Sequence, residues 1–232
     1  DHYTDYAMGH NPANRMPLWV KPSKKVSPKE VFDAMRDHYE GTPMDMTTDL
    51  GAGCNQLPYR WRPMSFEVDG VEYVNERATA TQQTGFWLVG QASRAAGDDL
   101  GILWFGVDDA ATSCLVPIYC SIDRVPECLS EHNGSMLKYS PTSMFWLFNR
   151  VTNFAYLRYN RMSKDLQEVA NRWENQVLKD VRQVTAEAQK LSGAERVKYV
   201  TDYSVMMAQE LFDLWKQMDE YLLVKYIDGN VK

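Results

Sequence analysis

The sequence lacks several features by which common classes of protein are recognised. No apolar run approaches the roughly 20 residues needed to span a bilayer, and no signal peptide is visible. Charge of one sign is not concentrated either, since 25 lysines and arginines oppose 31 aspartates and glutamates for a formal net charge of −6. A nucleic-acid surface needs a basic patch that neutralises phosphates. We therefore expect neither a membrane nor a nucleic acid among the partners of this chain.

Familiar catalytic motifs are also missing. The chain has no phosphate loop, no Gly-x-Gly-x-x-Gly turn and no Gly-x-Ser-x-Gly elbow. The histidines have neither the spacing of a helical zinc site nor an obvious carboxylate partner in the sequence, and the cysteines form no Cys-x-x-Cys pair. We expect no metal and no cofactor, and four free thiols that are mostly buried. The four histidines are His2, His10, His38 and His132, and the four cysteines are Cys54, Cys114, Cys120 and Cys128.

The chain nevertheless has the composition of an ordinary globular protein. Its 232 residues, 44% of them hydrophobic and 24% charged, are enough to bury a core. It begins with Asp1 and a polar, proline-broken stretch, so we expect a fragment or a processed chain whose beginning lies elsewhere. We take residues 1–232 as one domain or as the C-terminal portion of a larger catalytic domain, with residues 1–26 as an irregular lead-in.

Residues 27–41 carry the signals of a helix. Ser27 can cap it, Pro28 suits its first position, and Glu30 completes a capping box. Gly41 ends the pattern. His38 would lie in the last turn, where we interpret it as a surface residue.

Residues 60–122 predict an antiparallel sheet of four or five strands. Asp69-Gly70 between two short apolar runs is a strong signal of a two-residue hairpin. A strand would then run from Arg77 to about Gln91, and buried strands would follow at 101–107 and 113–122. Pro117 suggests that the last strand is an edge or contains a bulge.

Residues 140–228 predict long helices. Ser140-Pro141 reads as a helix start, and the pattern is interrupted near Ser163 and at Ser192-Gly193. A sheet followed by long helices indicates an α+β fold, in which the helices pack on the antiparallel sheet.

Two polar patches are candidates for chemistry. Arg77 and the polar run after it would line one strand, and an arginine suits a substrate carboxylate or a developing oxyanion; the alternative is an ion pair with Glu76 or with a sheet neighbour. Asp108-Asp109 could bind an amine or transfer a proton; the alternative is a turn capped by their side chains. We select Arg77 as the catalytic candidate, and the substrate-binding candidates are Thr79, Thr81, Gln82, Asp109 and Thr112.

Several separated segments resemble the C-terminal half of the bacterial cysteine dipeptidases of the N-terminal-nucleophile hydrolase superfamily. They are "LWVKPSKKVSPKEVFDAMRDHYEGTPMDMT", "PYRWRPMSFEVDGVEYVNERATATQQTGFWLVGQ", "GILWFGVDDAATSCLVPIYC" and "YSPTSMFWLFNRVTNFAYLRYNRM", which lie in this order between residues 17 and 162. The resemblance implies a four-layer αββα sandwich. It also implies a dipeptide substrate, no metal, and an N-terminal cysteine nucleophile whose own α-amino group serves as the base.

The sequence departs from this pattern at its first residue, which is Asp1 and not cysteine. The resemblance therefore implies that the nucleophile belongs to an upstream half of the same protein, and that Arg77 matches a strand-start arginine of related acylases. We expect the chain alone to be inactive, and we expect its exposed apolar sheet surface either to drive self-association into homo-oligomers or to leave the chain weakly stable. A non-catalytic packing or assembly domain and an acylase of non-peptide amides stay open as alternatives, as do a cytoplasmic and an exported location.

Overall fold

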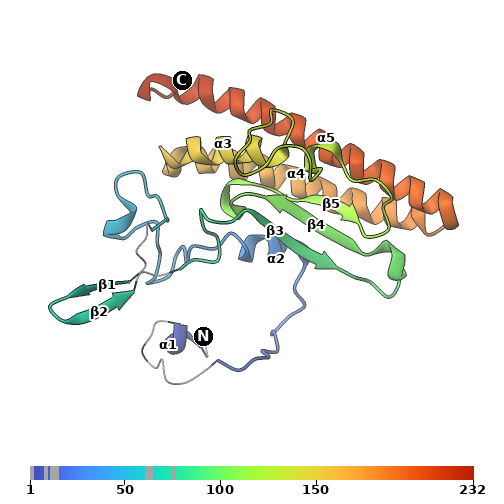
Figure 1. The fold of residues 1–232 in the computed structure, drawn as a ribbon. Helices are drawn as coiled ribbons and strands as arrows, with labels where there is room; N and C mark the ends of the chain where they lie inside the picture. Colours follow the sequence, from blue (N-terminus) through green and yellow to red (C-terminus); the bar gives the residue numbers. More distant parts are fainter. Residues whose placement is uncertain (1–2, 8–9, 11–15, 61–64, 75–76) are drawn as a thin grey trace.

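The computed structural model describes residues 3–7, 10, 16–60, 65–74 and 77–232. Within these residues the chain has an α+β fold, with small antiparallel sheets and long helices (Figure 1). The α-helices are α1 (Thr4–Ala7), α2 (Pro28–Ala34), α3 (Met144–Tyr156), α4 (Tyr159–Ala188) and α5 (Gly193–Tyr226). The strands are β1 (Ser65–Val68), β2 (Val71–Val74), β3 (Phe86–Gln91), β4 (Ile102–Val107) and β5 (Val116–Tyr119). The 3-10 turns are η1 (Leu50–Ala52), η2 (Asp98–Leu100), η3 (Ala110–Thr112), η4 (Glu127–Leu129) and η5 (Ile227–Gly229).

The central sheet has the order β3-β4-β5, and all its pairs are antiparallel. Trp87 lies opposite Gly106, and Val89 lies opposite Trp104. Gly106 leaves the room that the Trp87 indole fills, because a Cβ atom there would lie 2.4 Å from the indole nitrogen. Since opposed residues point to the same side of a sheet, the two tryptophans share one face.

Helices cover this tryptophan face. Phe32 of α2 meets the Trp104 ring edge-on at 5.1 Å between centroids, and the Tyr119 hydroxyl lies 2.7 Å from that of Thr185 on α4. Helix α5 runs beside the edge strand β5, where Ser204 Oγ accepts a hydrogen bond from the Tyr119 amide at 3.1 Å. A helix over an edge strand prevents unwanted pairing with other strands.

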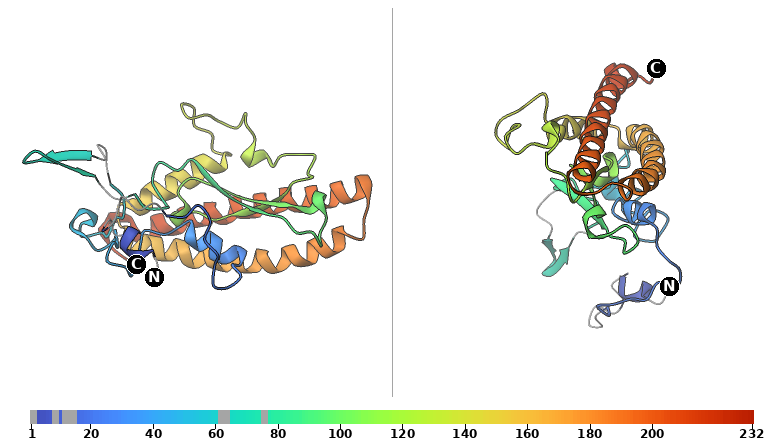
Figure 2. Two further views of the ribbon diagram at one scale, coloured as in Figure 1. Left: turned by 90° about the horizontal axis from the view of Figure 1, so that it is seen from below. Right: turned by 90° about the vertical axis from the view of Figure 1, so that its right-hand side faces the viewer.

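Helices α4 and α5 form a long hairpin that extends along the sheet (Figure 2). Apart from the buried Glu174, their charged residues are exposed or partly exposed. No helix in the described ranges combines the length and the apolarity needed to cross a membrane.

A buried ion pair joins α2 to α4. The Arg36 guanidinium donates to both carboxylate oxygens of Glu174, at 2.5 and 3.0 Å. Arg36 also donates to the backbone oxygens of Ala110 and Ser113, and Glu174 accepts from the Leu115 amide. Two helices and the segment that leads into β5 are thereby fixed at one point.

The opposite face of the central sheet is apolar and partly open. Phe86 and Leu88 are 62% and 44% exposed, and Phe86 stacks on Phe105 with 6.0 Å between ring centroids. In a four-layer sandwich this face would pack against a second sheet.

The structure confirms the predicted hairpin but corrects the extent of the predicted sheet. Asp69 and Gly70 both have positive φ, 52° and 79°, and join β1 to β2 as predicted. This hairpin is, however, a separate sheet (Figure 1). The strand expected from Arg77 begins only at Phe86, because Thr84 donates to the Thr81 carbonyl in a turn. The expected strands 101–107 and 113–122 are β4 and the shorter edge strand β5, which contains Pro117.

The helix expected over residues 27–41 ends at Ala34, although its capping box forms as predicted. Asp37 Oδ1 accepts from the Tyr39 amide at 2.9 Å, and Tyr39 has a φ of 66°. A side-chain turn of this kind competes with continued helix.

The long helical region also differs in detail. The first helix begins at Met144 and not at Ser140-Pro141. The break expected near Ser163 lies at Leu157–Arg158, where Asn55 bonds to the Leu157 carbonyl and to the Asn160 amide. The break at Ser192-Gly193 is confirmed.

Replacement of the buried carboxylate should be costly. Glu174→Gln leaves the Arg36 charge, on a side chain only 11% exposed, without its nearest counter-ion, so that only the more distant Asp33 carboxylate at 3.7 Å remains. We expect the free energy of unfolding to fall by about 3–5 kcal/mol, as for other broken buried pairs, in urea titrations at neutral pH. Glu168→Gln is the matched control, because it breaks the exposed pair with Arg172 on the same helix and should change stability little. Equal effects of the two variants would contradict a central role for Glu174.

The open sheet face should drive self-association of the isolated chain. The double variant Phe86→Ser, Leu88→Ser removes apolar surface at this face, and we expect a shift toward monomer in sedimentation-velocity experiments. Leu50→Ser is the control, because Leu50 is fully exposed but lies in η1, away from the central sheet. A monodisperse wild-type monomer at high concentration would refute the expectation.

Candidate functional site

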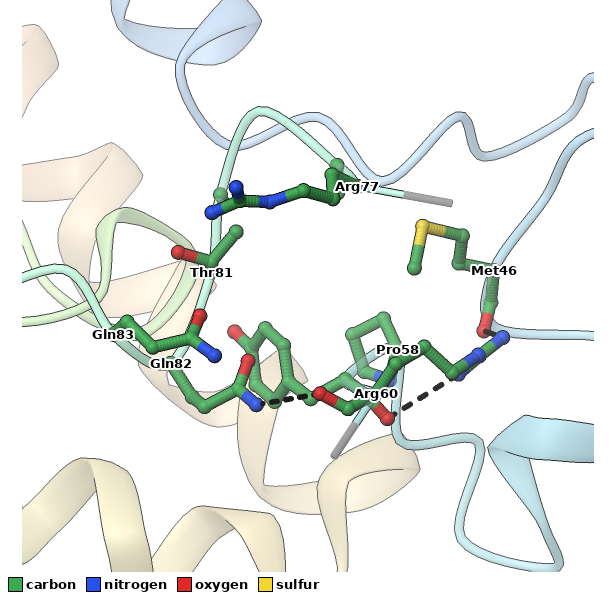
Figure 3. Close-up of a pocket in the computed structure, with 10 residues that line it drawn as sticks. Met46, Pro58, Arg60, Arg77, Thr81, Gln82 and Gln83 are labelled. Carbon is green, nitrogen blue, oxygen red and sulfur yellow. Dashed lines mark hydrogen bonds between the residues drawn. The ribbon is translucent and has the colours of Figure 1, made fainter. Parts of the chain in front are cut away.

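The polar run after Arg77 gathers around a small pocket together with residues of the loop that precedes β1. Thr81, Gln82 and Gln83 line one side, and Pro58 and Arg60 line the other (Figure 3). We call this the Arg77 pocket. Its full lining is Met46, Pro58, Tyr59, Arg60, Arg77, Ala78, Ala80, Thr81, Gln82 and Gln83. The enclosed volume is about 20 Å³, which is space for about one water molecule.

The segment that carries Arg77 is held in place by its backbone. Thr79 and Ala80 donate to the Asp37 carbonyl, and the Tyr39 hydroxyl donates to the Arg77 carbonyl. The two sides of the pocket are joined because Gln82 Nε2 donates to the Arg60 carbonyl at 3.0 Å. An irregular segment therefore presents these side chains in a fixed arrangement.

Two arginines line the pocket, and they differ in whether a described acidic residue pairs with them. Arg60 is paired with Asp49 and donates to the Met46 carbonyl. The guanidinium of Arg77 points toward Thr81 in Figure 3 and, within the residues that the structure describes, makes neither a hydrogen bond nor an ion pair. Glu76, its alternative partner, lies outside the described residues. Arg77 thus offers a positive charge and a fork of donors to an anionic group.

Asp109 lies behind the Tyr59 ring and has no exposed surface. It accepts hydrogen bonds from the hydroxyls of Tyr59 and Tyr156, the latter at 3.1 Å, and from the Ala111 amide at the same distance. Burial raises its pKa to about 6, although the hydrogen bond from Tyr59 opposes that rise. Asp109 also caps η3, so the expected capping role occurs.

Asp108 is buried in a left-handed conformation with a φ of 65°. Burial raises its pKa, and the hydrogen bond that it accepts from Asn149 Nδ2 at 2.9 Å opposes this shift. Its second oxygen has no partner among the described residues. Asn149 of α3 therefore supports the turn at the end of β4.

His38 corrects the sequence interpretation, because it is fully buried and not on the surface. The helix that would have exposed it ends earlier, and its Nδ1 lies 3.0 Å from Glu40 Oε1. Burial would raise the pKa of Glu40, but hydrogen bonds from His38 outweigh it and lower that pKa. The His38 ring lies edge-on to those of Tyr59 and Tyr159, at 5.5 and 6.2 Å.

The selected residues divide into two groups. Arg77, Thr81 and Gln82 line one pocket, whereas Thr79 is exposed and outside that lining. Asp109 and Thr112 are buried and also outside it; the Thr112 hydroxyl lies 2.8 Å from that of Thr152 on α3. Sequence reasoning missed Tyr59, and the "PYR" run offered no periodic signal that could reveal it.

All four cysteines are free, as predicted, but only two of them are buried. Burial raises the pKa of the Cys114 thiol well above its usual value and raises that of Cys128 to about 11. Cys54 and Cys120 are exposed, and none of the four lines the Arg77 pocket. Among the described residues, no three histidine, cysteine or acidic side chains are placed to hold a metal ion.

Asp109 should make stability depend on pH. The unfolded carboxyl titrates near pH 4 and the folded one near 6. The stabilising contribution is thus complete below about pH 4 and is lost as pH rises to about 6. As the pH rises from about 4 to about 6, the free energy of unfolding of wild type should fall, relative to that of Asp109→Asn, by on the order of 2–3 kcal/mol. Urea titrations at pH 4.5 and 7 measure it, and a constant difference would contradict the assignment.

Comparison with known proteins assigns the chain to a family. A search of curated proteins found no match. The model of peptidase family C69 matches residues 2–172, which include the Arg77 pocket, the central sheet and the Asp109 turn. Because the match covers well over half of the 232 residues, the chain belongs to peptidase family C69, a family of peptide hydrolases.

Proposed function

We propose that this chain forms part of the substrate cleft of a cysteine dipeptidase, and that Arg77 faces a nucleophile supplied by an upstream segment of the same protein. One observation carries the proposal: a guanidinium without a partner among the described residues, a threonine and a glutamine line one pocket in the region that matches the peptidase family. A small polar pocket lined by an arginine suits a single polarised carbonyl or carboxylate group of a substrate.

The cysteines of this chain support a nucleophile from elsewhere. A reactive cysteine needs a thiolate and access to substrate. Cys114 and Cys128 are buried with raised pKa values, and the two exposed cysteines lie outside the Arg77 pocket. An N-terminal cysteine would bring its own base, because its α-amino group titrates near pH 8 and can accept the thiol proton at neutral pH.

The proposed reaction is acyl transfer to sulfur followed by hydrolysis. The α-amino group takes the thiol proton, and the sulfur attacks the peptide carbonyl carbon to give a tetrahedral oxyanion. Collapse breaks the C–N bond, the leaving amine takes the proton, and water then hydrolyses the thioester. Arg77 stabilises the developing negative charge, for which a preorganised cation is effective.

Arg77→Ala in the complete enzyme should lower kcat/KM for dipeptides at least tenfold, because charge stabilisation is lost. Arg172→Ala is the control, since Arg172 is an exposed arginine on α4 outside the pocket. A loss of less than about threefold, or below roughly 0.7 kcal/mol, would rule out the proposed role of Arg77.

A dipeptide panel with the purified 232-residue chain tests the source of the nucleophile, with and without a thiol alkylator. We expect no turnover by this chain alone, and turnover once the upstream segment is present. Turnover that alkylation abolishes would show that one of the four cysteines performs the reaction. No turnover in the complete protein would favour a packing or assembly role, for which the open sheet face offers a surface.

A further inference from the structure

The wall of the Arg77 pocket depends on a carboxylate that the pocket does not contain. Tyr59 is only 5% exposed, yet its ring is part of the lining. Its hydroxyl donates to Asp109, which is not among the lining residues. The Tyr59 ring packs edge-on against the rings of Tyr156, His38 and Tyr159, at 4.8, 5.5 and 6.1 Å between centroids.

Two hydrogen bonds link the Tyr59 backbone to the polar side of the pocket. The Tyr59 carbonyl accepts from Arg60 Nη1 at 3.3 Å, and the Arg60 carbonyl accepts from Gln82 Nε2 at 3.0 Å. Gln82 lies in the segment that also presents Arg77 and Thr81. A shift of Tyr59 would therefore displace the anchor of this segment.

Stability alone does not explain why a carboxylate occupies this position. A fully buried carboxyl costs free energy, and its raised pKa reflects that cost. Apolar replacements of buried ionic groups are often neutral or stabilising. What a carboxylate adds is direction, because it accepts the two tyrosine hydroxyls at fixed places.

We propose that Asp109 is a positioning residue, which acts through the hydroxyl of Tyr59 to set the wall of the Arg77 pocket. The relevance of this wall to dipeptides rests on the proposed function above. Tyr156 is a natural comparison, since its hydroxyl binds the same Asp109 oxygen but its ring lies outside the pocket lining.

The test compares Tyr59→Phe with Tyr156→Phe in the 232-residue chain. Each variant removes one hydroxyl from Asp109, so a merely structural role predicts similar effects. We expect similar losses of melting temperature but different local effects, measured by amide hydrogen exchange. Exchange over residues 79–84 should rise at least fivefold in Tyr59→Phe and stay within twofold of wild type in Tyr156→Phe. Asp109→Asn should change the same segment in the same direction as Tyr59→Phe.

Calorimetric titration with L-alanyl-L-alanine separates this inference from the proposed function. The dissociation constant should rise at least fivefold in Tyr59→Phe and remain within twofold in Tyr156→Phe. If wild type binds no dipeptide while the exchange difference holds, the proposed function fails at this pocket and the positioning role stands. Equal exchange in the two variants overturns the positioning role whatever the titration gives, as does an unchanged segment in Asp109→Asn.

Discussion

The buried pair of Arg36 and Glu174 is the interaction on which the rest of the structure depends. Glu174 is fully buried in the middle of a 30-residue helix, where an unpaired carboxylate would be costly. Arg36 compensates it with two hydrogen bonds and uses its other donors on the Ala110 and Ser113 carbonyls. The guanidinium also lies over the Trp87 ring at 4.9 Å. One cation thereby fixes α2, α4, the central sheet and the segment before β5.

This pair and the site are connected through short stretches of chain. Arg36 is followed within two residues by Asp37, whose carbonyl anchors the Arg77 segment, and by His38, which packs on Tyr59. On the other side, the Ala110 carbonyl that Arg36 binds directly follows Asp109. Both walls of the pocket are therefore attached, through a few residues of chain, to the same ion pair. The loops that line the pocket have little regular structure, and this anchoring explains how they can still hold defined positions.

Local chemistry explains which parts of the fold could be predicted from the sequence. The capping box at Ser27 and the Asp69-Gly70 hairpin follow from neighbouring residues, so both were predicted correctly. The early end of α2 comes from a local side-chain turn between Asp37 and Tyr39, which competes with the helical signals of the same residues. The break before α4, in contrast, depends on Asn55, about 100 residues away. Contacts of that separation leave no periodic pattern. The same limit applies to the site: the spacing of Arg77, Thr81 and Gln82 indicated a polar surface, but the pairing of Tyr59 with Asp109 joins residues 50 apart.

The two arginines of the Arg77 pocket differ in how their charges are used within the protein. Arg60 is neutralised by Asp49 and holds three backbone carbonyls, so its charge is used within the protein. Arg77 has no such partner among the described residues, although Tyr39 binds its carbonyl and Asp37 binds the amides of Thr79 and Ala80 that follow it. A cation whose main chain is held while its side chain is free loses little further backbone entropy when it binds an anion. We propose that the buried network of Asp109 and Tyr59 fixes the wall that faces Arg77. Little of the binding free energy would then be used to order the pocket.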